Sequence, residues 1–283
     1  MANDRQLMTS NERRCELLVV CCKLIGMASW ASQRRMTYLA LVAGVLLLVI
    51  SVPLFLYFNK PETCFDGLQN GNELGIDCGG ACEKLCESQV ADLLVHWSRF
   101  AKAGEGLYDV AAFVQNPNAM GGAENVAYIF KLYDKDNLLI AERRGKTFIN
   151  PNEQFALFEG AIETGARIPA RAFFEFIEMP HWVDVSFRKP DLFITKKQLV
   201  MNGVKPEVRA TLENRSLSDF EDIVLTSFLI DDNENVVGIS KTELGLVKQN
   251  STRDVTFLFP EQLAKTPARV DVFFRVNLVS ARQ

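Results

Sequence analysis

The chain has 283 residues, with 31 Lys and Arg against 35 Asp and Glu, so its formal net charge is −4. Hydrophobic residues make up 48% of the chain and charged residues 23%, values that exclude wholesale disorder. Mild acidity argues against a nucleic-acid-binding protein, which needs a basic face, so we expect no nucleic-acid partner. Only two histidines occur, His96 and His181, which weakens the case for His-based catalysis.

The first predicted element is the uncharged segment 36–59. Within it, Thr37–Phe58 would extend about 33 Å as a helix, which is enough to cross a bilayer core of about 30 Å. Tyr38 and Tyr57 lie near the two ends, where interfacial aromatic side chains are common. The segment therefore predicts a transmembrane helix that contacts the lipid bilayer through Thr37–Phe58. A buried core helix is the alternative, but few soluble helices are apolar all round over this length.

Flanking charge predicts the orientation of this helix. Residues 1–35 are richer in Lys and Arg than the stretch after the helix, and positive residues stay on the cytoplasmic side. We therefore expect 1–35 to be a cytoplasmic tail and the C-terminal bulk to be extracytoplasmic, in the cell envelope. A cleaved signal peptide is the alternative. The charged leader is long and no A-x-A-like site follows the apolar run, so we expect a retained signal-anchor of a single-pass cell-membrane protein.

The predicted tail contains a shorter apolar segment, Glu16–Trp30, which Lys23 interrupts. It is too short to span a membrane and could lie along the cytoplasmic surface as an amphipathic helix. Cys15, Cys21 and Cys22 fall in or beside this segment. In a reducing compartment we expect them to be free thiols, with lipidation as the alternative.

A cysteine-rich stalk is predicted over residues 60–87. The four remaining cysteines of the chain lie here, at Cys64, Cys78, Cys82 and Cys86. Outside the cytoplasm such a cluster predicts two disulfides, because a segment this small buries too little apolar surface to fold without cross-links. Three pairings satisfy the sequence, and spacing does not choose among them.

Two kinds of metal site are alternatives to the disulfides. A zinc site is disfavoured because the paired C-x2-C knuckles are absent. A calcium site would use oxygen ligands in a Gly-rich loop, but the spacing of an EF-hand is absent. We therefore expect neither a metal nor another cofactor. The oxygen ligands considered for calcium are Asp66, Asn70, Asn72, Glu73 and Asp77.

The stalk resembles a short module of secreted and surface proteins. That module reads Cys-x-Asp-Gly-x-Gln-Asn-Gly-x-Glu, followed by Asp-Cys-Gly-Gly-x-Cys. The resemblance implies an extracytoplasmic address more than an activity. The matching residues are Cys64, Asp66, Gly67, Gln69, Asn70, Gly71, Glu73, Asp77, Cys78, Gly79, Gly80 and Cys82.

The rest of the chain contains an internal repeat with a spacing of 98 residues, which separates Asn116 from Asn214 and Phe130 from Phe228. Short segments of alternating polarity, separated by Asn, Asp, Pro and Gly, are typical of half-buried strands. We therefore predict an all-β fold of tandem immunoglobulin-like β-sandwiches behind one N-terminal transmembrane helix. The first sandwich domain is predicted over residues 88–187 and the second over 188–283.

Alternation also predicts which side chains share the buried face of corresponding strands. In the first copy these are Val126, Tyr128, Phe130 and Leu132. In the second copy they are Val224, Thr226, Phe228 and Ile230. Polar turns are expected to follow at Asp134 and at Asp232.

The segment Phe130-Lys-Leu132-Tyr133-Asp134 resembles the signature of the FxLYD domains. Val114–Asn116 and Ile149–Pro151 are also similar to that family's pattern. The second copy departs from it, because Phe228-Leu-Ile-Asp-Asp232 has Ile and Asp where the family has Leu and Tyr. The resemblance implies sandwich domains of prokaryotic envelope proteins with no common catalytic residue, and it extends loosely to the late-embryogenesis-abundant type 2 sandwiches.

No catalytic motif is found in the sequence. A nucleophile elbow, a Walker loop, a His-Glu-x-x-His motif and a Cys-x-x-Cys pair are all missing. We expect Phe130, Leu132 and Phe228 to pack in cores, and Asp134 and Asp232 to form turns. Phe158 and Phe173 are the aromatic candidates for an exposed patch that contacts a partner, and the alternative, which is the commoner case, is that they fill the interface between the two sandwiches.

These observations predict a non-enzymatic membrane-anchored protein that presents two β-sandwiches to another envelope protein or a surface polymer. A subunit of a membrane complex is one alternative. An enzyme that processes envelope carbohydrates or peptides at a site between the sandwiches is the other.

Overall fold

A computed structural model describes residues 30–58, 63–185, 189–202, 205–263 and 265–280. The chain divides into two compact units, residues 1–62 and 63–283. The predicted surface helix lies outside the described residues except for Trp30, and so do Cys15, Cys21 and Cys22.

Helix α2 spans Trp30–Phe58 and contains Pro53. Its segment Ser32–Phe58 is long and apolar enough to cross a membrane. The helix begins six residues before the predicted start, because the polar residues ahead of the apolar run continue its first turns. The Arg34 guanidinium stacks over the Trp30 ring at 3.9 Å, and the Thr37 hydroxyl donates to the carbonyl of Gln33 at 2.9 Å.

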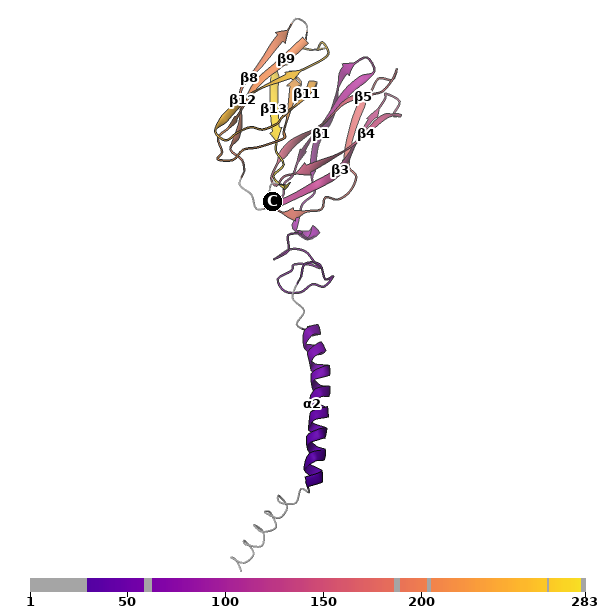
Figure 1. Ribbon diagram of the computed structural model, residues 1–283. Coiled ribbons are helices and arrows are strands. Elements are labelled where there is room, and N and C mark those ends of the chain that lie inside the picture. Colours follow the sequence, from indigo (N-terminus) through magenta and orange to yellow (C-terminus); the bar gives the residue numbers. More distant parts are fainter. Residues whose placement is uncertain (1–29, 59–62, 186–188, 203–204, 264, 281–283) are drawn as a thin grey trace, which may run out of the picture. The chain divides into compact units, whose positions relative to one another are not determined.

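The second unit consists mainly of antiparallel strands, which confirms the predicted all-β fold behind one helix. Figure 1 shows these strands in two groups, one coloured magenta to salmon and one orange to yellow. In the first group one sheet has the order β1-β2-β5 and the other β4-β3-β6, with β7 paired to β3. Their bounds are β1 Leu94–Gly104, β2 Leu107–Gln115, β3 Gly121–Tyr133, β4 Leu139–Ile149, β5 Gln154–Glu163, β6 Arg171–Phe176 and β7 Val183–Asp184. A short 3-10 helix, Glu87–Gln89, precedes β1.

The second group repeats this order with β8-β9-β12 in one sheet and β11-β10-β13 in the other. Strand β8 begins 98 residues after β1, and β13 begins 98 residues after β6. Each group encloses its own apolar core between its two sheets. The bounds are β8 Leu192–Asn202, β9 Lys205–Asn214, β10 Ile223–Ile230, β11 Val236–Leu244, β12 Ser251–Leu258 and β13 Arg269–Arg275.

Among the identities at this spacing, Asn116 and Asn214 have matching structural roles. Asn116 and Asn214 are both buried, at 0% and 1% exposure, just after β2 and at the end of β9. The Asn116 side-chain amide donates to the carbonyls of Gly121 and Asn150, both at 2.8 Å. The Asn214 amide donates to the carbonyls of three residues in the loops it joins. Each asparagine therefore satisfies buried carbonyls where two loops cross.

Strands β2 and β10 are buried on both faces. On β2, Val110, Ala112 and Val114 enter the core of the first sandwich, while Ala111 points the other way. A third apolar cluster joins Ala111 to Phe228 of β10. The cluster is completed by Ala156, Ile230 and Ile239, with Trp97, Ala101, Phe113, Phe158, Val236 and Phe273 packed against it. The sheets β1-β2-β5 and β11-β10-β13 therefore pack against each other.

Phe228 was expected in a sandwich core, but it shares with Ile230 a face of β10 that does not line the core of the second sandwich. It is 1% exposed, but it lies in the cluster between the two sandwiches rather than in the core of the second. The core of the second sandwich takes Ile223, Leu225 and Leu229 from the opposite face of β10. Alternation could not distinguish these faces, because a strand covered on both sides is apolar on both sides.

A buried arginine adds a polar contact to this apolar one. Arg275, at the end of β13, is 5% exposed and forms an ion pair with Glu153 at 3.2 Å. Its guanidinium also donates to the Thr147 hydroxyl at 3.0 Å and to the Phe148 carbonyl at 2.6 Å. The ring of Phe155 lies 4.0 Å from the guanidinium carbon. The cation of the second sandwich is therefore satisfied by groups of the first.

Asn150 holds the segment that follows β13. Its side-chain amide donates to the carbonyl of Val276 at 2.9 Å, and its side-chain oxygen accepts from the backbone amide of Leu278 at 3.1 Å. A neutral pair of hydrogen bonds thus extends the contact beyond Arg275.

Truncating Phe130 or Phe228 to Ala is expected to lower the free energy of unfolding by about 3–5 kcal/mol each, because both rings are completely enclosed. Urea denaturation measures this loss. Leu258→Ala is the control, since Leu258 is 66% exposed and should change stability little. A negligible loss for Phe228→Ala would contradict the contact between the sandwiches.

Candidate functional site

The four cysteines of the stalk form two disulfides, Cys64–Cys82 and Cys78–Cys86. The structure therefore selects one of the three pairings that the sequence left open. The first bond joins residues 18 positions apart and the second joins residues 8 positions apart, so the two closed loops overlap along the chain. Cys78, Cys82 and Cys86 are buried, although the segment contributes few other apolar side chains to a core.

The acidic residues of this disulfide loop bind backbone amides. The Asp77 carboxylate accepts from the amides of Asp66 and Gly67 at 2.9 Å. Asp66 in turn accepts from the amide of Leu68 and from the side chain of Asn70, at 2.9 and 2.8 Å. These carboxylates, considered above as calcium ligands, thus replace the secondary structure that a loop this short lacks.

Glu73 and Asn72 complete the group considered for calcium. One oxygen of Glu73 accepts from the amides of Asn70 and Asp77, both at 3.3 Å. Asn72 is exposed, and its carbonyl oxygen would lie 1.7 Å from a Cβ added at Gly80, which has φ +63°. Gly80 is therefore required for the close approach of two backbone segments, which explains its place in the motif.

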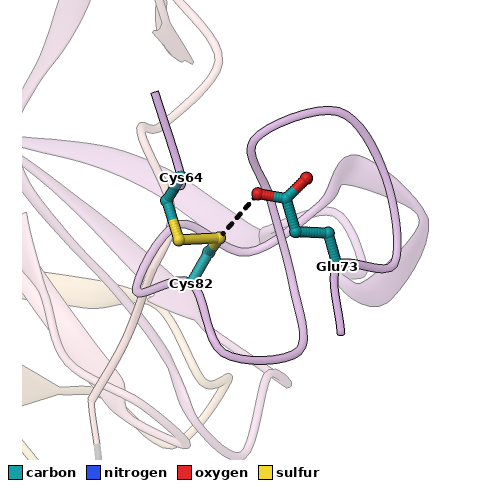
Figure 2. A group of neighbouring side chains, drawn as sticks. All are labelled: Cys64, Glu73 and Cys82. Carbon is teal, nitrogen blue, oxygen red and sulfur yellow. Dashed lines mark hydrogen bonds between the residues drawn. A yellow bond between two sulfur atoms is a disulfide. The ribbon is translucent and has the colours of Figure 1, made fainter. Parts of the chain in front are cut away.

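Cys64, Glu73 and Cys82 place one ligand atom each within 4.8 Å of one another. Figure 2 shows the Glu73 carboxylate turned toward the Cys82 sulfur, 3.3 Å away. Both sulfurs belong to the disulfide, so neither is a thiolate and neither has a proton to donate. A metal ion binds thiolate sulfur, so these three residues are not a metal site while the bond is oxidised.

The disulfide loop is joined to the first sandwich. The amide of Leu85 donates to the carbonyl of Trp182 at 3.0 Å, and Lys84 forms a β-bridge with Val183. Trp182 is 7% exposed and belongs to the first core, against which Leu85 packs. The loop therefore belongs to the same body as the sandwich and is no free spacer.

The residues of the FxLYD-like segment have different roles. Phe130 and Leu132 are buried in the first core, and the Phe130 ring lies 4.9 Å from that of Phe174. Tyr133 is half-buried and points away from this core, toward an open cavity described below. Asp134 closes the turn after β3, where one carboxylate oxygen accepts from two backbone amides at 3.0 Å.

In the second copy this turn uses Asp231 and not Asp232. One oxygen of Asp231 accepts from the amides of Asn233 and Asn235 at 2.9 and 2.8 Å, while Asp232 is exposed. The two corresponding turns are 97 residues apart and not 98, so Asp232 does not take the place of Asp134. The sequence does contain a signal for this turn, because Asp231 and Asp232 are adjacent and either could be aligned with Asp134.

The electrostatics of Asp231 follow from these contacts. The backbone amide of Asn235 lowers the pKa of Asp231 to about 2, with a further contribution from the Lys265 ammonium at 3.1 Å. The backbone amide of Leu138 likewise lowers the pKa of Asp134, and Arg167 adds to the effect. Both carboxylates are therefore charged above pH 4 and act as fixed acceptors in their turns.

Neither histidine belongs to a cluster of reactive groups in the described part of the chain. His96 lies on β1 and contacts the side chain of Gln115 at 3.0 Å, and His181 is exposed beside β7. A cavity between the sandwiches, of about 600 Å³, has Glu153 as its single acidic lining residue. Glu153 is held by Arg275, as described above.

An open cavity of about 580 Å³ lies on the first sandwich, where β1, β3 and β6 meet. Of the aromatic candidates, Phe173 lines it and is 58% exposed, whereas Phe158 packs between the sandwiches. The sequence did not identify this cavity, because its residues come from three segments that are far apart in the chain. It is the candidate binding site of the molecule.

Comparisons with known proteins do not assign the chain. No family matches it, and no curated protein matches it. Among solved structures it is similar to the crystal structure of red sea bream transglutaminase, with 13% sequence identity and a TM-score of 0.23. The similarity covers 67% of this chain and 30% of that chain. A TM-score this low carries no argument about function.

Peptide mapping of the unreduced protein is expected to recover Cys64 linked to Cys82 and Cys78 linked to Cys86. Thiol labelling before reduction should leave all four unmodified, because each sulfur is already bonded. Mass spectrometry after proteolysis reads both results. Recovery of either other pairing would show that the loop folds differently.

Asp231→Asn is expected to weaken the acid sensitivity of the second sandwich. In the unfolded chain Asp231 has a pKa near 3.8 and in the folded chain about 2, so the unfolded state binds more protons between these values. The stability that Asp231 contributes is present above about pH 4 and is lost as the pH falls toward 2. Urea denaturation at a series of pH values should show a smaller loss over this range in the variant.

Asp232→Asn is the matched control for this measurement, because the neighbouring side chain is exposed. It should leave the pH dependence as in the original chain. The assignment of the turn is wrong if Asp232→Asn flattens the profile and Asp231→Asn does not.

Proposed function

We propose that the chain is a non-enzymatic single-pass membrane protein, which displays tandem immunoglobulin-like sandwiches of the FxLYD type outside the cell membrane. Helix α2 would be a retained signal-anchor, with residues 1–35 in the cytoplasm. The two sandwiches would be diverged copies that bind another component of the envelope.

The observation that carries the proposal is the order of two features along the chain. An apolar helix long enough to cross a membrane is followed directly by a loop that two disulfides hold together. Disulfides persist in oxidising compartments, and the Lys and Arg residues before the helix favour a cytoplasmic N-terminus. Both arguments favour the same side of the membrane for the sandwiches.

The internal similarity supports the tandem arrangement. Both sandwiches have the same strand order, and Asn116 and Asn214 take the same place in it. The shared turn of Asp134 and Asp231 supports the same interpretation. The FxLYD assignment rests on the residues of the first copy, because the second lacks the Leu and Tyr of the motif.

Protease treatment of intact spheroplasts tests the topology. In a chain with a different epitope tag at each end, external protease should remove the C-terminal tag and spare the N-terminal tag, because only the former is outside. Detergent-permeabilised spheroplasts, in which both tags should be lost, are the control. Protection of the C-terminal tag together with loss of the N-terminal tag would contradict the proposal.

A further inference from the structure

The open cavity of the first sandwich is lined by cations and aromatic rings. Its charged lining residues are Arg99, Lys131 and Arg171, and no Asp or Glu lines it. This composition is unlike that of the whole chain, which has a net charge of −4. The remaining lining residues are Ser98, Phe100, Tyr133, Asn137, Ala170, Ala172 and Phe173.

Pairing between β3 and β6 sets the pattern of these side chains. Lys131 lies opposite Phe173, and Tyr133 lies opposite Arg171. Directly opposed residues on one face of a sheet have Cβ atoms about 5 Å apart, so cation and ring alternate in both directions. Arg99 is contributed by β1, from the other sheet. It also lines a smaller cavity with Glu234 and Asp271, but both of these carboxylates are paired with Arg269.

Two of the three cations are available to a ligand. Lys131 donates to Glu175, so a carboxylate of the protein already compensates it. Among the described residues no carboxylate pairs with Arg99 or Arg171. The Arg99 guanidinium donates to the backbone carbonyl of Ser98 at 3.1 Å, and both arginine side chains are exposed. A guanidinium presents parallel N–H groups that match the two oxygens of a carboxylate.

The exposed ring adds a second requirement. Phe173 is 58% exposed, although its neighbour Phe174 is buried in the core. An aromatic face has negative potential, and it attracts the C–H groups on the flat face of a sugar ring. The volume of about 580 Å³ is within the range of small-ligand sites, which have roughly 300–1,000 Å³.

We propose that this cavity binds an acidic saccharide, with Arg99 and Arg171 on its carboxylates and Phe173 against a sugar ring. The inference rests on the proposed function, because it names the class of envelope component that the first sandwich would bind. Tyr133, at the end of the FxLYD-like segment, borders the same ligand.

An acidic peptide is the competing ligand, and the strands disfavour it. An extended peptide binds a sheet by adding a strand to a regular open edge. Strand β6 has only six residues, and β1 is interrupted by register shifts at Val95/Trp97 and Lys102/Gly104. Short and bulged edges resist strand addition, so recognition here depends on side chains.

Calorimetric titration of the full chain in lipid nanodiscs tests the proposal with three probes. Trigalacturonate carries both carboxylates and sugar rings, maltotriose carries rings alone, and triglutamate carries carboxylates on a peptide. We expect trigalacturonate to bind and the other two to bind at least about tenfold more weakly. Arg171→Ala and Phe173→Ala should each weaken trigalacturonate binding by about tenfold or more.

Arg253→Ala and Leu258→Ala are matched controls, because they remove an exposed arginine and an exposed apolar side chain from the second sandwich. Neither should change the affinity. Failure of the original chain to bind trigalacturonate would overturn the proposal. Equal binding of triglutamate, or binding that Phe173→Ala leaves intact, would also overturn it in favour of unselective attraction of anions.

The two proposals fail separately. If trigalacturonate binds but the C-terminal tag is protected, the proposed topology is wrong and the proposed binding site stands. If the C-terminal tag is exposed but trigalacturonate does not bind, the proposed binding site is wrong and the proposed topology stands.

Discussion

The arrangement of the β-structure depends on two strands that are buried on both faces. Strand β2 gives Val110, Ala112 and Val114 to one core and Ala111 to the contact between the sandwiches. Ala111 and Phe228 of β10 belong to the same buried cluster there. Because a strand alternates its side chains, nine residues of β2 serve both surfaces at once.

Apolar packing alone does not fix the orientation of one sandwich on the other, because it is not directional. The polar contacts of Arg275 are directional and select one orientation. Removing a charge from water is costly. The sandwiches can therefore pack only in an arrangement that places the guanidinium against Glu153 and the acceptors beside it. Docking that misplaced Arg275 would leave a buried cation unpaired. Together with the attachment of the disulfide loop through Trp182, this contact makes one body of three segments, and that body presents the open cavity in a fixed frame.

The sequence predicted the all-β fold, the helix and the disulfide-bonded loop, because each depends on local composition or spacing. It could not show which face of β10 lines the core of the second sandwich, because Phe228 and Leu225 are equally apolar. The two faces differ only because the first sandwich covers the face that carries Phe228. Asp232 was predicted in the place of Asp231 because one shortened connection shifts the register, which no local pattern records. The cavity at Phe173 could not be predicted from the sequence, because three segments that are distant in the sequence form it.

The contact between the sandwiches is tested most directly by the distance between Trp97 and Phe228, whose ring centroids lie 5.1 Å apart. Nuclear Overhauser spectroscopy of the full chain with labelled aromatic rings measures it. The structure predicts a cross-peak between these two rings, as strong as that between Phe130 and Phe174, whose centroids lie 4.9 Å apart within one core. Absence of the first cross-peak in a spectrum that shows the second would mean that the sandwiches do not pack together as described.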